Sequence, residues 1–252
     1  MNPFFIFAFI PIAAKWYNSL ESLGYDNHYI VALDEQTWTH FKNQEYRVFN
    51  ATEHLHTDPD GSVRLSKLWQ IRLHTIYKLL EDKVNVLLTD TDLIYLNHYK
   101  LEDLPHNFDI YHTQGGTFPK WAYEKWGFTI CGCLAGYRST SNTRQFLKFV
   151  IKSCKGSVQC DDQAVLNSIY SQYYDMEFFQ PAGMSIKIGK SRKEERDLKV
   201  LVMSEESVKR GGEVSECLDL KENRKTWVLG PHAPKVVAKK LTMFKNFEAC
   251  IK

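Results

Sequence analysis

Two carboxylates divide an apolar run at residues 84–96, and this run constrains the fold more than any other part of the chain. It reads Val-Asn-Val-Leu-Leu-Thr-Asp-Thr-Asp-Leu-Ile-Tyr-Leu. Strands that are apolar on both faces are typical of α/β proteins, whose ligands collect at the carboxyl ends of the strands. We therefore expect Asp90 and Asp92 at the mouth of a cleft, where their oxygens suit Mg²⁺ or Mn²⁺ holding a diphosphate.

The same pair of aspartates also fits a simpler interpretation, because acidic residues at a strand end often form only a polar turn. Here both flanking segments are apolar, so the carboxylates lie close to buried structure. Buried charges need a partner or a metal ion. The other motifs of the chain have to decide between a turn and a metal site.

Length and composition predict one α/β domain over residues 1–252. The chain is 44% hydrophobic and 25% charged, as is usual for globular proteins with a full core. A net charge of +2 is too small to indicate a nucleic-acid partner or an anionic membrane surface. The apolar start, residues 1–14, is too short for a membrane span and lacks a basic leader, so it predicts a first core strand and no membrane segment in this chain.

The six cysteines leave two interpretations open. Cys131 and Cys133 do not have the spacing of a zinc pair. Four cysteines fall within residues 131–160, so disulfides fit an oxidising compartment, and free buried thiols fit equally well. Asn50 opens a glycosylation sequon, which matters only if the protein is lumenal or secreted.

Apolar periodicity predicts strands alternating with helices, and hence a mostly parallel central sheet flanked by helices. The expected strands cover residues 4–10, 29–33, 46–49, 84–89, 93–96, 109–113, 128–137 and 199–203. The expected helices cover residues 11–24, 62–82 and 141–154, with one more between residues 35 and 46 and another beginning after Cys160. An aromatic stretch at 121–128 is expected to be irregular, and the charged stretch at 187–199 to be a solvated loop.

Three features outside the acidic pair are candidates for a functional role, and each also has a simpler structural explanation. Arg72 lies on the apolar stripe of the helix at 62–82, and either extends to the surface or reaches the phosphate site. Asp162 and Gln163 stand at a helix start, where acidic residues commonly cap the helix, but a cap explains one aspartate better than two with a glutamine. The aromatic residues at 121–128 either stack on sugars or simply fill the core.

In this order, the pieces resemble the nucleotide-diphospho-sugar transferase domain of GT-A glycosyltransferases, a Rossmann-like fold. They are most similar to the family that includes the plant rhamnogalacturonan xylosyltransferases. The matching pieces extend from about residue 4 to residue 235: the strand end at 33–34, the helix before the acidic run, the run 86–96, the strand at 132–138, the segment 160–167 and a late histidine, His232.

The resemblance assigns roles to individual residues. It implies that the metal ligands are Asp90, Asp92 and His232, that the nucleotide contacts are Asp90, Arg72, Asp34 and Lys235, and that the sugar side of the cleft is lined by Asp162 and Gln163. It also implies a Mn²⁺- or Mg²⁺-dependent, retaining transfer from a nucleotide-sugar, with UDP as the expected carrier, to a glycan or glycoprotein acceptor. A Golgi or ER lumen location is implied in the same way, with the cytoplasm as the alternative.

Two other classes of protein remain to be weighed. Phosphatases of the HAD type also carry Asp-x-Asp after an apolar strand, but on their first strand and with Thr or Val two residues past the second aspartate, where this chain has Ile94. A non-catalytic protein that binds a nucleotide-sugar or glycan on the same fold is the other alternative. Turnover of the donor distinguishes it from an enzyme.

Overall fold

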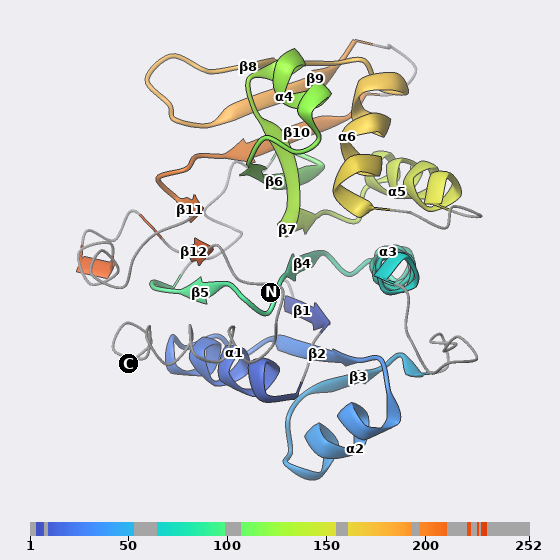
Figure 1. Cartoon of the computed structure of the whole chain (residues 1–252), viewed down its shortest axis with the longest axis vertical. Coiled ribbons are helices and arrows are strands. Elements are labelled where there is room, and N and C mark those ends of the chain that lie inside the picture. Colours follow the sequence, from blue (N-terminus) through green and yellow to red (C-terminus); the bar gives the residue numbers. More distant parts are fainter. Residues whose placement is uncertain are drawn as a thin grey trace.

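The computed structural model describes residues 4–7, 10–52, 65–98, 107–154, 161–192, 197–210, 221–222, 226 and 228–230. These residues form a nine-stranded sheet with helices packed on it and a separate three-stranded sheet (Figure 1). The helices are α1 Ile10–Ser22, α2 Glu35–Asn43, α3 Leu65–Glu81, α4 Lys120–Trp126, α5 Ser141–Cys154 and α6 Asp162–Gln172. The strands are β1 Phe4–Phe7, β2 His28–Ala32, β3 Val48–Asn50, β4 Val86–Thr89, β5 Ile94–Tyr95, β6 Ile110–Gly115, β7 Thr129–Tyr137, β8 Met176–Phe179, β9 Lys187–Ser191, β10 Lys199–Met203, β11 Val208–Arg210 and β12 Val228–Gly230.

The large sheet has the strand order β3-β2-β1-β4-β7-β6-β10-β9-β8. Its α/β class is confirmed, but the expectation of a mostly parallel sheet needs correction, because four neighbouring pairs are parallel and four are antiparallel. The antiparallel pairs arise because β7 and β9 run against the other strands. All nine residues of β7 are buried, and a strand buried on both faces does not reveal its direction in its sequence.

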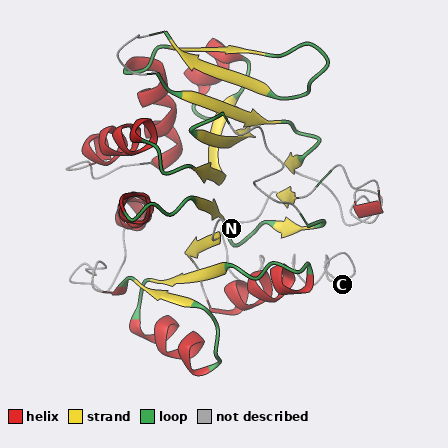
Figure 2. Ribbon diagram, turned by 180° about the vertical axis from the view of Figure 1, so that it is seen from behind, coloured by secondary structure: helices red, strands yellow, loops and turns green. Residues whose placement is uncertain are grey.

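Helices cover both faces of the large sheet (Figure 2). On one face, α3, α5 and α6 contribute Leu80, Phe146 and Ile169 to a continuous core. On the other face, α1 and α2 contribute Leu20 and Phe41 to a second core, which also contains residues of the small sheet. The sheet is therefore buried on both faces. Polar side chains of the sheet that bind a ligand would have to lie at the ends of its strands. None of the described helices is long and apolar enough to cross a membrane.

Local sequence signals explain several element boundaries. Gly24 has a left-handed φ of +82°, which ends α1 where the sequence predicts a stop. Asp34 caps α2 by accepting hydrogen bonds from the backbone N–H and the hydroxyl of Thr37, both at 2.7 Å. Asp161 caps α6 in the same way by accepting from the N–H of Ala164 at 2.8 Å.

Two stretches differ from the sequence-based expectation. The aromatic stretch expected to be irregular contains α4, which ends at Gly127 in a left-handed conformation with φ of 76°. The charged stretch expected to be a solvated loop contains β9, which pairs with β8 and β10. A Cβ at Gly189 of β9 would overlap the ring of Phe178, so the pairing of β8 with β9 depends on this glycine.

The small sheet, ordered β11-β12-β5, lies beside the acidic turn. Its strand β5 begins two residues after Asp92, and the hydroxyl of Tyr95 donates to Thr89 Oγ1 at 2.9 Å. Strand β12 runs antiparallel to β5, with Val228 opposite Tyr95 and Leu229 opposite Ile94. The chain near residue 230 is therefore brought back to the segment that carries the two aspartates.

The cysteines of the described region do not share one state. Cys131 and Cys133 are free, buried thiols on β7, whereas Cys154 at the end of α5 is disulfide-bonded. Both interpretations of the cysteines therefore apply, each to different residues.

Candidate functional site

The acidic pair lies at the carboxyl end of β4, as the sequence predicts. All four residues of β4 are buried. The backbone N–H of Asp90 still pairs with the sheet, donating to the carbonyl of Cys133 at 2.7 Å, and the carbonyl of Asp90 accepts from the N–H of Leu93 at 3.3 Å. Asp90 and Asp92 thus lie in a tight turn between two buried strands, and these strands fix the backbone positions of both aspartates.

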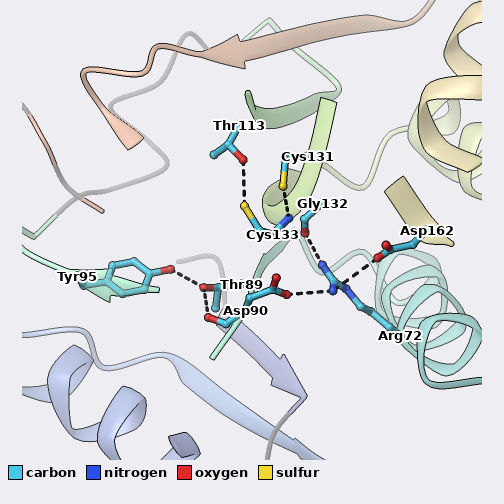
Figure 3. A network of polar contacts seen from close by, with 9 residues as sticks. All are labelled: Arg72, Thr89, Asp90, Tyr95, Thr113, Cys131, Gly132, Cys133 and Asp162. Atoms are coloured by element: carbon cyan, nitrogen blue, oxygen red, sulfur yellow. Dashed lines mark hydrogen bonds and ion pairs between the residues drawn. The ribbon is translucent and has the colours of Figure 1, made fainter. Parts of the chain in front are cut away.

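Arg72 is the centre of a polar cluster that joins three elements (Figure 3). Its Nη1 lies 3.1 Å from Asp90 Oδ1 and 3.6 Å from Asp162 Oδ2. Its Nη2 donates to the carbonyl of Gly132 on β7. The side chain is only 11% exposed, so Arg72 turns inward from α3 and does not extend to the surface.

Burial disfavours the ionised carboxylates of this cluster, and Arg72 offsets that effect only in part. Burial disfavours the guanidinium charge, but the carboxylates of Asp90 and Asp162 raise the pKa of Arg72 nevertheless. Burial raises the pKa of Asp90 to about 7; Arg72 opposes this rise, and Asp92 and Asp162 add to it. Burial likewise raises the pKa of Asp162, again against the effect of Arg72. A further positive charge would therefore stabilise the ionised cluster.

A hard divalent cation fits this need. Asp90 and Asp92 offer carboxylate oxygens, the donors that Mg²⁺ and Mn²⁺ prefer, and the Asp90 side chain is 39% exposed and thus accessible from solvent. Within the described ranges, no group of three or more His, Cys, Asp or Glu side chains is arranged to hold a metal. The two aspartates would therefore hold the ion together with further ligands, from the substrate or from elsewhere in the chain.

His232 and Lys235, which the sequence places in the site, lie outside the described residues. The described strand β12 ends at Gly230, two residues before His232. Its antiparallel pairing with β5 carries the chain toward the turn that holds Asp92.

The two aspartates at the beginning of α6 have different roles, which the sequence alone could not distinguish. Asp161 is the N-cap, so the capping interpretation applies to this residue. Asp162 instead faces Arg72, with its side chain 15% exposed. Gln163 donates from its side-chain amide to the carbonyl of Phe118, in the loop between β6 and α4. The two residues predicted on the sugar side therefore lie next to Arg72 and next to this loop.

Asp34 lies at the same edge of the sheet as Asp90, but its carboxylate is hydrogen-bonded to the helix that follows it. Strand β2, which precedes it, is parallel to β4 and separated from it by β1. Neighbouring strands are about 4.8 Å apart, so Asp34 follows a strand roughly 10 Å from that of Asp90. Its carboxylate accepts two bonds from Thr37, which gives it a role as a helix cap. Its contact with a nucleotide stays a prediction.

Sequence reasoning missed the residue that joins α6 to β7. Asn167 is fully buried, and its side chain accepts from the N–H of Ile130 at 3.0 Å and donates to the Ile130 carbonyl at 2.8 Å. It also donates to the carbonyl of Gln163 at 2.7 Å. A single asparagine on a helix gives no signal of such a link. Gly132 did give a signal, as a glycine inside a strand, and the structure places it beside Arg72 and Asp162.

Comparisons with known proteins agree with this geometry. Residues 24–218 match the family model described as nucleotide-diphospho-sugar transferase. No curated protein matches the chain in sequence. Among solved structures, the chain is similar to a glycosyltransferase involved in the glycosylation of the major capsid of PBCV-1, with a TM-score of 0.52, 8% identity, and coverage of 97% of this chain and 100% of that chain.

Two further solved structures share the fold. The WbbM bifunctional glycosyltransferase has a TM-score of 0.58 and 13% identity, covering 99% of this chain and 49% of that one. Mouse xyloside xylosyltransferase 1 has a TM-score of 0.51 and 9% identity, covering 94% of this chain and 99% of that one. At such low identities the likeness shows a common fold and carries no substrate from one protein to another.

Proposed function

This chain belongs to the nucleotide-diphospho-sugar transferase family, and from that premise we propose a specific reaction for it. It is a glycosyltransferase of the GT-A fold. The proposed reaction is the metal-dependent transfer of a sugar from a UDP-sugar to a glycan or glycoprotein acceptor, with retention of configuration. The UDP carrier, the acceptor and the retention rest on the resemblance to the xylosyltransferase family.

The observation that carries the metal-dependent part of the proposal is the cluster at the end of β4. Asp90 and Asp162 share one guanidinium, that of Arg72, and the charge of Asp92 acts on Asp90, at a strand end where α/β sheets bind ligands. A divalent ion bound by Asp90 and Asp92 would neutralise the negative charge that develops on the leaving diphosphate. The direction of β12 supports His232 as a third ligand, because this strand runs antiparallel to β5 and so toward the Asp92 turn as it approaches Gly230.

The remaining roles in the proposed reaction fall to three side chains. Arg72, held between two carboxylates, would orient Asp90 and offer its guanidinium to the diphosphate. Asp162 would lie beside the sugar, where a carboxylate stabilises the positive charge that develops at the anomeric carbon as the bond to the diphosphate breaks. Gln163 would position the loop after β6, because its amide is bonded to the Phe118 carbonyl.

The test is a nucleotide-release assay over UDP- and GDP-sugars with Mn²⁺, with and without EDTA. We expect slow, EDTA-sensitive hydrolysis of one UDP-sugar, because water can replace the acceptor. Asp92→Asn should lose both this hydrolysis and the Mn²⁺-dependent calorimetric affinity for UDP. Asp82→Asn, at the exposed end of α3, serves as the matched control. Binding of UDP without hydrolysis of any donor would favour a binding protein. An unchanged Mn²⁺-dependent affinity for UDP in Asp92→Asn would show that Asp92 is not a metal ligand.

We also propose that the protein works in the Golgi or ER lumen. The disulfide at Cys154 supports this location, because disulfides persist in oxidising compartments. The sequon residue Asn50 is exposed on the edge strand β3, where a glycan would be accommodated. Expression in a secretory host followed by mass spectrometry of the Asn50 peptide tests access to the lumen. An unmodified Asn50 together with reduced Cys154 would favour the cytoplasmic alternative.

A further inference from the structure

Two aromatic side chains next to the proposed transfer site are exposed to solvent. Phe118, in the loop after β6, is 55% exposed, and Trp121, at the start of α4, is 41% exposed. Large aromatic side chains dominate cores and binding sites because of the area that they bury. Single exposed apolar residues need no explanation, so the question is what distinguishes this pair.

The first distinguishing feature is that the loop that carries Phe118 and leads into α4 is anchored by two hydrogen bonds. Thr129 Oγ1 donates to the carbonyl of Gly116 at 2.8 Å, and the Gln163 amide donates to the carbonyl of Phe118. Gly115, where the loop begins, has no room for a side chain, since a Cβ there would lie 2.5 Å from Thr129 Oγ1. The aromatic rings are therefore carried by a backbone anchored on β7 and α6. An anchored loop binds a ligand at a smaller cost in conformational entropy than a free one.

The second feature is continuity with the proposed transfer site. Gln163, which anchors Phe118, follows Asp162, and Asp162 pairs with Arg72. Helix α4, which carries Trp121, packs against α6 and β7, the two elements that also supply Asp162 and Gly132 (Figure 1). The segments that carry the exposed rings are therefore bonded to or packed against α6, whose first residues are expected on the sugar side of the site.

The third feature is charge. The charged side chains of α4 are engaged with neighbours: Lys120 lies 3.5 Å from Glu124, and Lys125 donates to Ser171 Oγ at 2.8 Å. No charged residue occurs between Gly115 and Pro119. The rings themselves offer an apolar surface, and the exposed Lys120 and Glu124 beside them carry opposite charges that cancel. Such a surface suits the apolar face of a pyranose ring.

We propose that Phe118 and Trp121 form the acceptor platform of the transferase, on which a neutral sugar of a glycan stacks with its apolar face. This inference rests on the proposed function, because it assigns the acceptor class of the same site. Stacking on the two rings would hold the acceptor hydroxyl toward the donor sugar beside Asp162. Gln163 is then a positioning residue, which fixes the platform relative to the sugar through its bond to the Phe118 carbonyl.

The test uses the full chain with saturating UDP and Mn²⁺ and a panel of neutral methyl glycosides as probes: the galactoside, glucoside, xyloside, fucoside and rhamnoside. Binding is followed by saturation-transfer NMR and by tryptophan fluorescence. We expect at least one glycoside to bind the wild type, and Phe118→Ser and Trp121→Ser each to weaken that binding at least tenfold. Phe49→Ser is the matched control, because Phe49 is 39% exposed, close to the 41% of Trp121, but lies on the edge strand β3.

The outcomes separate this inference from the function on which it rests. Calorimetric binding of UDP with Mn²⁺ should be unchanged in both platform variants, which also shows that they are folded. Loss of glycoside binding with intact UDP binding supports the platform. Glycoside binding that survives both substitutions, or a wild type that binds UDP but none of the glycosides, overturns it. A wild type that binds neither UDP nor any glycoside overturns the proposed function instead.

Discussion

At the scale of single residues, Arg72 shows how one buried cation organises the site. Its guanidinium is shared between Asp90 and Asp162 and is nearly inaccessible to solvent. Removing one partner of a buried ion pair is costly, because the remaining charge has lost its compensation. The stability of the chain and the geometry of the site are therefore expected to depend on the same residue.

We predict that Arg72→Gln lowers the free energy of unfolding by about 3 kcal/mol, because the two carboxylates lose their partner. Adding Asp162→Asn should restore part of that loss, because one uncompensated charge is removed with it. Urea unfolding followed by tryptophan fluorescence measures both. Arg192→Gln is the control: its 3.9 Å pairs with Asp175 and Glu177 are exposed, so it should change stability by less than about 1 kcal/mol. A double variant no more stable than Arg72→Gln would contradict the prediction.

Two buried histidines predict a loss of stability in acid. Burial lowers the pKa of both His28 and His112 from 6.5 to about 4. His112 is held neutral, since its Nδ1–H donates to the carbonyl of Cys131 at 3.2 Å while Nε2 accepts from the hydroxyl of Tyr170 at 2.8 Å. In the unfolded chain both imidazoles protonate near pH 6.5, so stability present above that pH is lost as the pH falls toward 4.

We expect each of these histidines to reduce the free energy of unfolding by about 2 kcal/mol between pH 7.5 and pH 5. The raised pKa of Asp90 and of Asp162 acts in the opposite direction, because these folded carboxyls bind protons more readily than unfolded ones. His112→Gln isolates the histidine contribution: it should be less stable at pH 7.5 but lose less stability on acidification than the wild type. Equal losses on acidification would show that folding does not lower the pKa of His112.

At the scale of secondary-structure elements, the position of α6 depends on Asn167. This side chain satisfies the N–H and the carbonyl of Ile130 on β7 and the carbonyl of Gln163 one turn earlier on α6. Without it, buried backbone groups of β7 lose their partners. The residues at the start of α6, Asp162 and Gln163, would lose a contact that holds them against the sheet.

We predict that Asn167→Ala lowers the free energy of unfolding by about 2–4 kcal/mol, because two buried backbone groups become unsatisfied. It should also reduce donor hydrolysis more than it reduces UDP affinity, because α6 carries the sugar side of the proposed site. Ser168→Ala, the next residue on the same helix, is the matched control for both measurements. Unchanged stability in Asn167→Ala would mean that water replaces its hydrogen bonds.

The elements could be predicted from sequence to the extent that their signals are local. Strand β4 with its acidic end, helix α5 and the end of α1 follow from apolar runs, periodicity and a glycine stop, and the structure confirms them. The direction of β7 could not be predicted, because burial on both faces carries no direction. Strand β9 was missed because Lys187 and Lys190 interrupt its apolar pattern, and β8 was missed because it is only four residues long and contains Glu177.

For the site, sequence reasoning identified the residue types but not their contacts. Asp90, Asp162 and Arg72 were candidates, but the two possible directions of the Arg72 side chain could be decided only from its contacts with Asp90, Gly132 and Asp162. The hydrogen bonds of Asn167 and the anchoring of the loop at Phe118 likewise join residues far apart in sequence. Such pairings depend on strand order, which a single sequence does not specify.

At the scale of the whole molecule, two segments far apart in the sequence, β5 and β12, pair beside the site. Strand β5 continues from the acidic turn and pairs with β12, and the side-chain amide of Asn97 donates to the carbonyl of Thr226 at 2.8 Å. The C-terminal part of the chain is thus tied to the segment that carries Asp92. A ligand held jointly by the acidic turn and by residues after Gly230 would link the two segments in the folded state.

We predict that UDP with Mn²⁺ stabilises the wild type through this link and that His232→Ala loses most of the effect. At a hundredfold excess over Kd, binding adds about 2.7 kcal/mol, or about 5–10 °C in Tm for a chain of this size. His232→Ala should melt like the wild type without ligand, and should gain less than half of that shift with it. EDTA should abolish the shift in the wild type. His40→Ala on α2 is the control and should keep the full shift. If His232→Ala also lowers the ligand-free Tm by several degrees, His232 has a structural role, and if it keeps the full shift, another group completes the metal site.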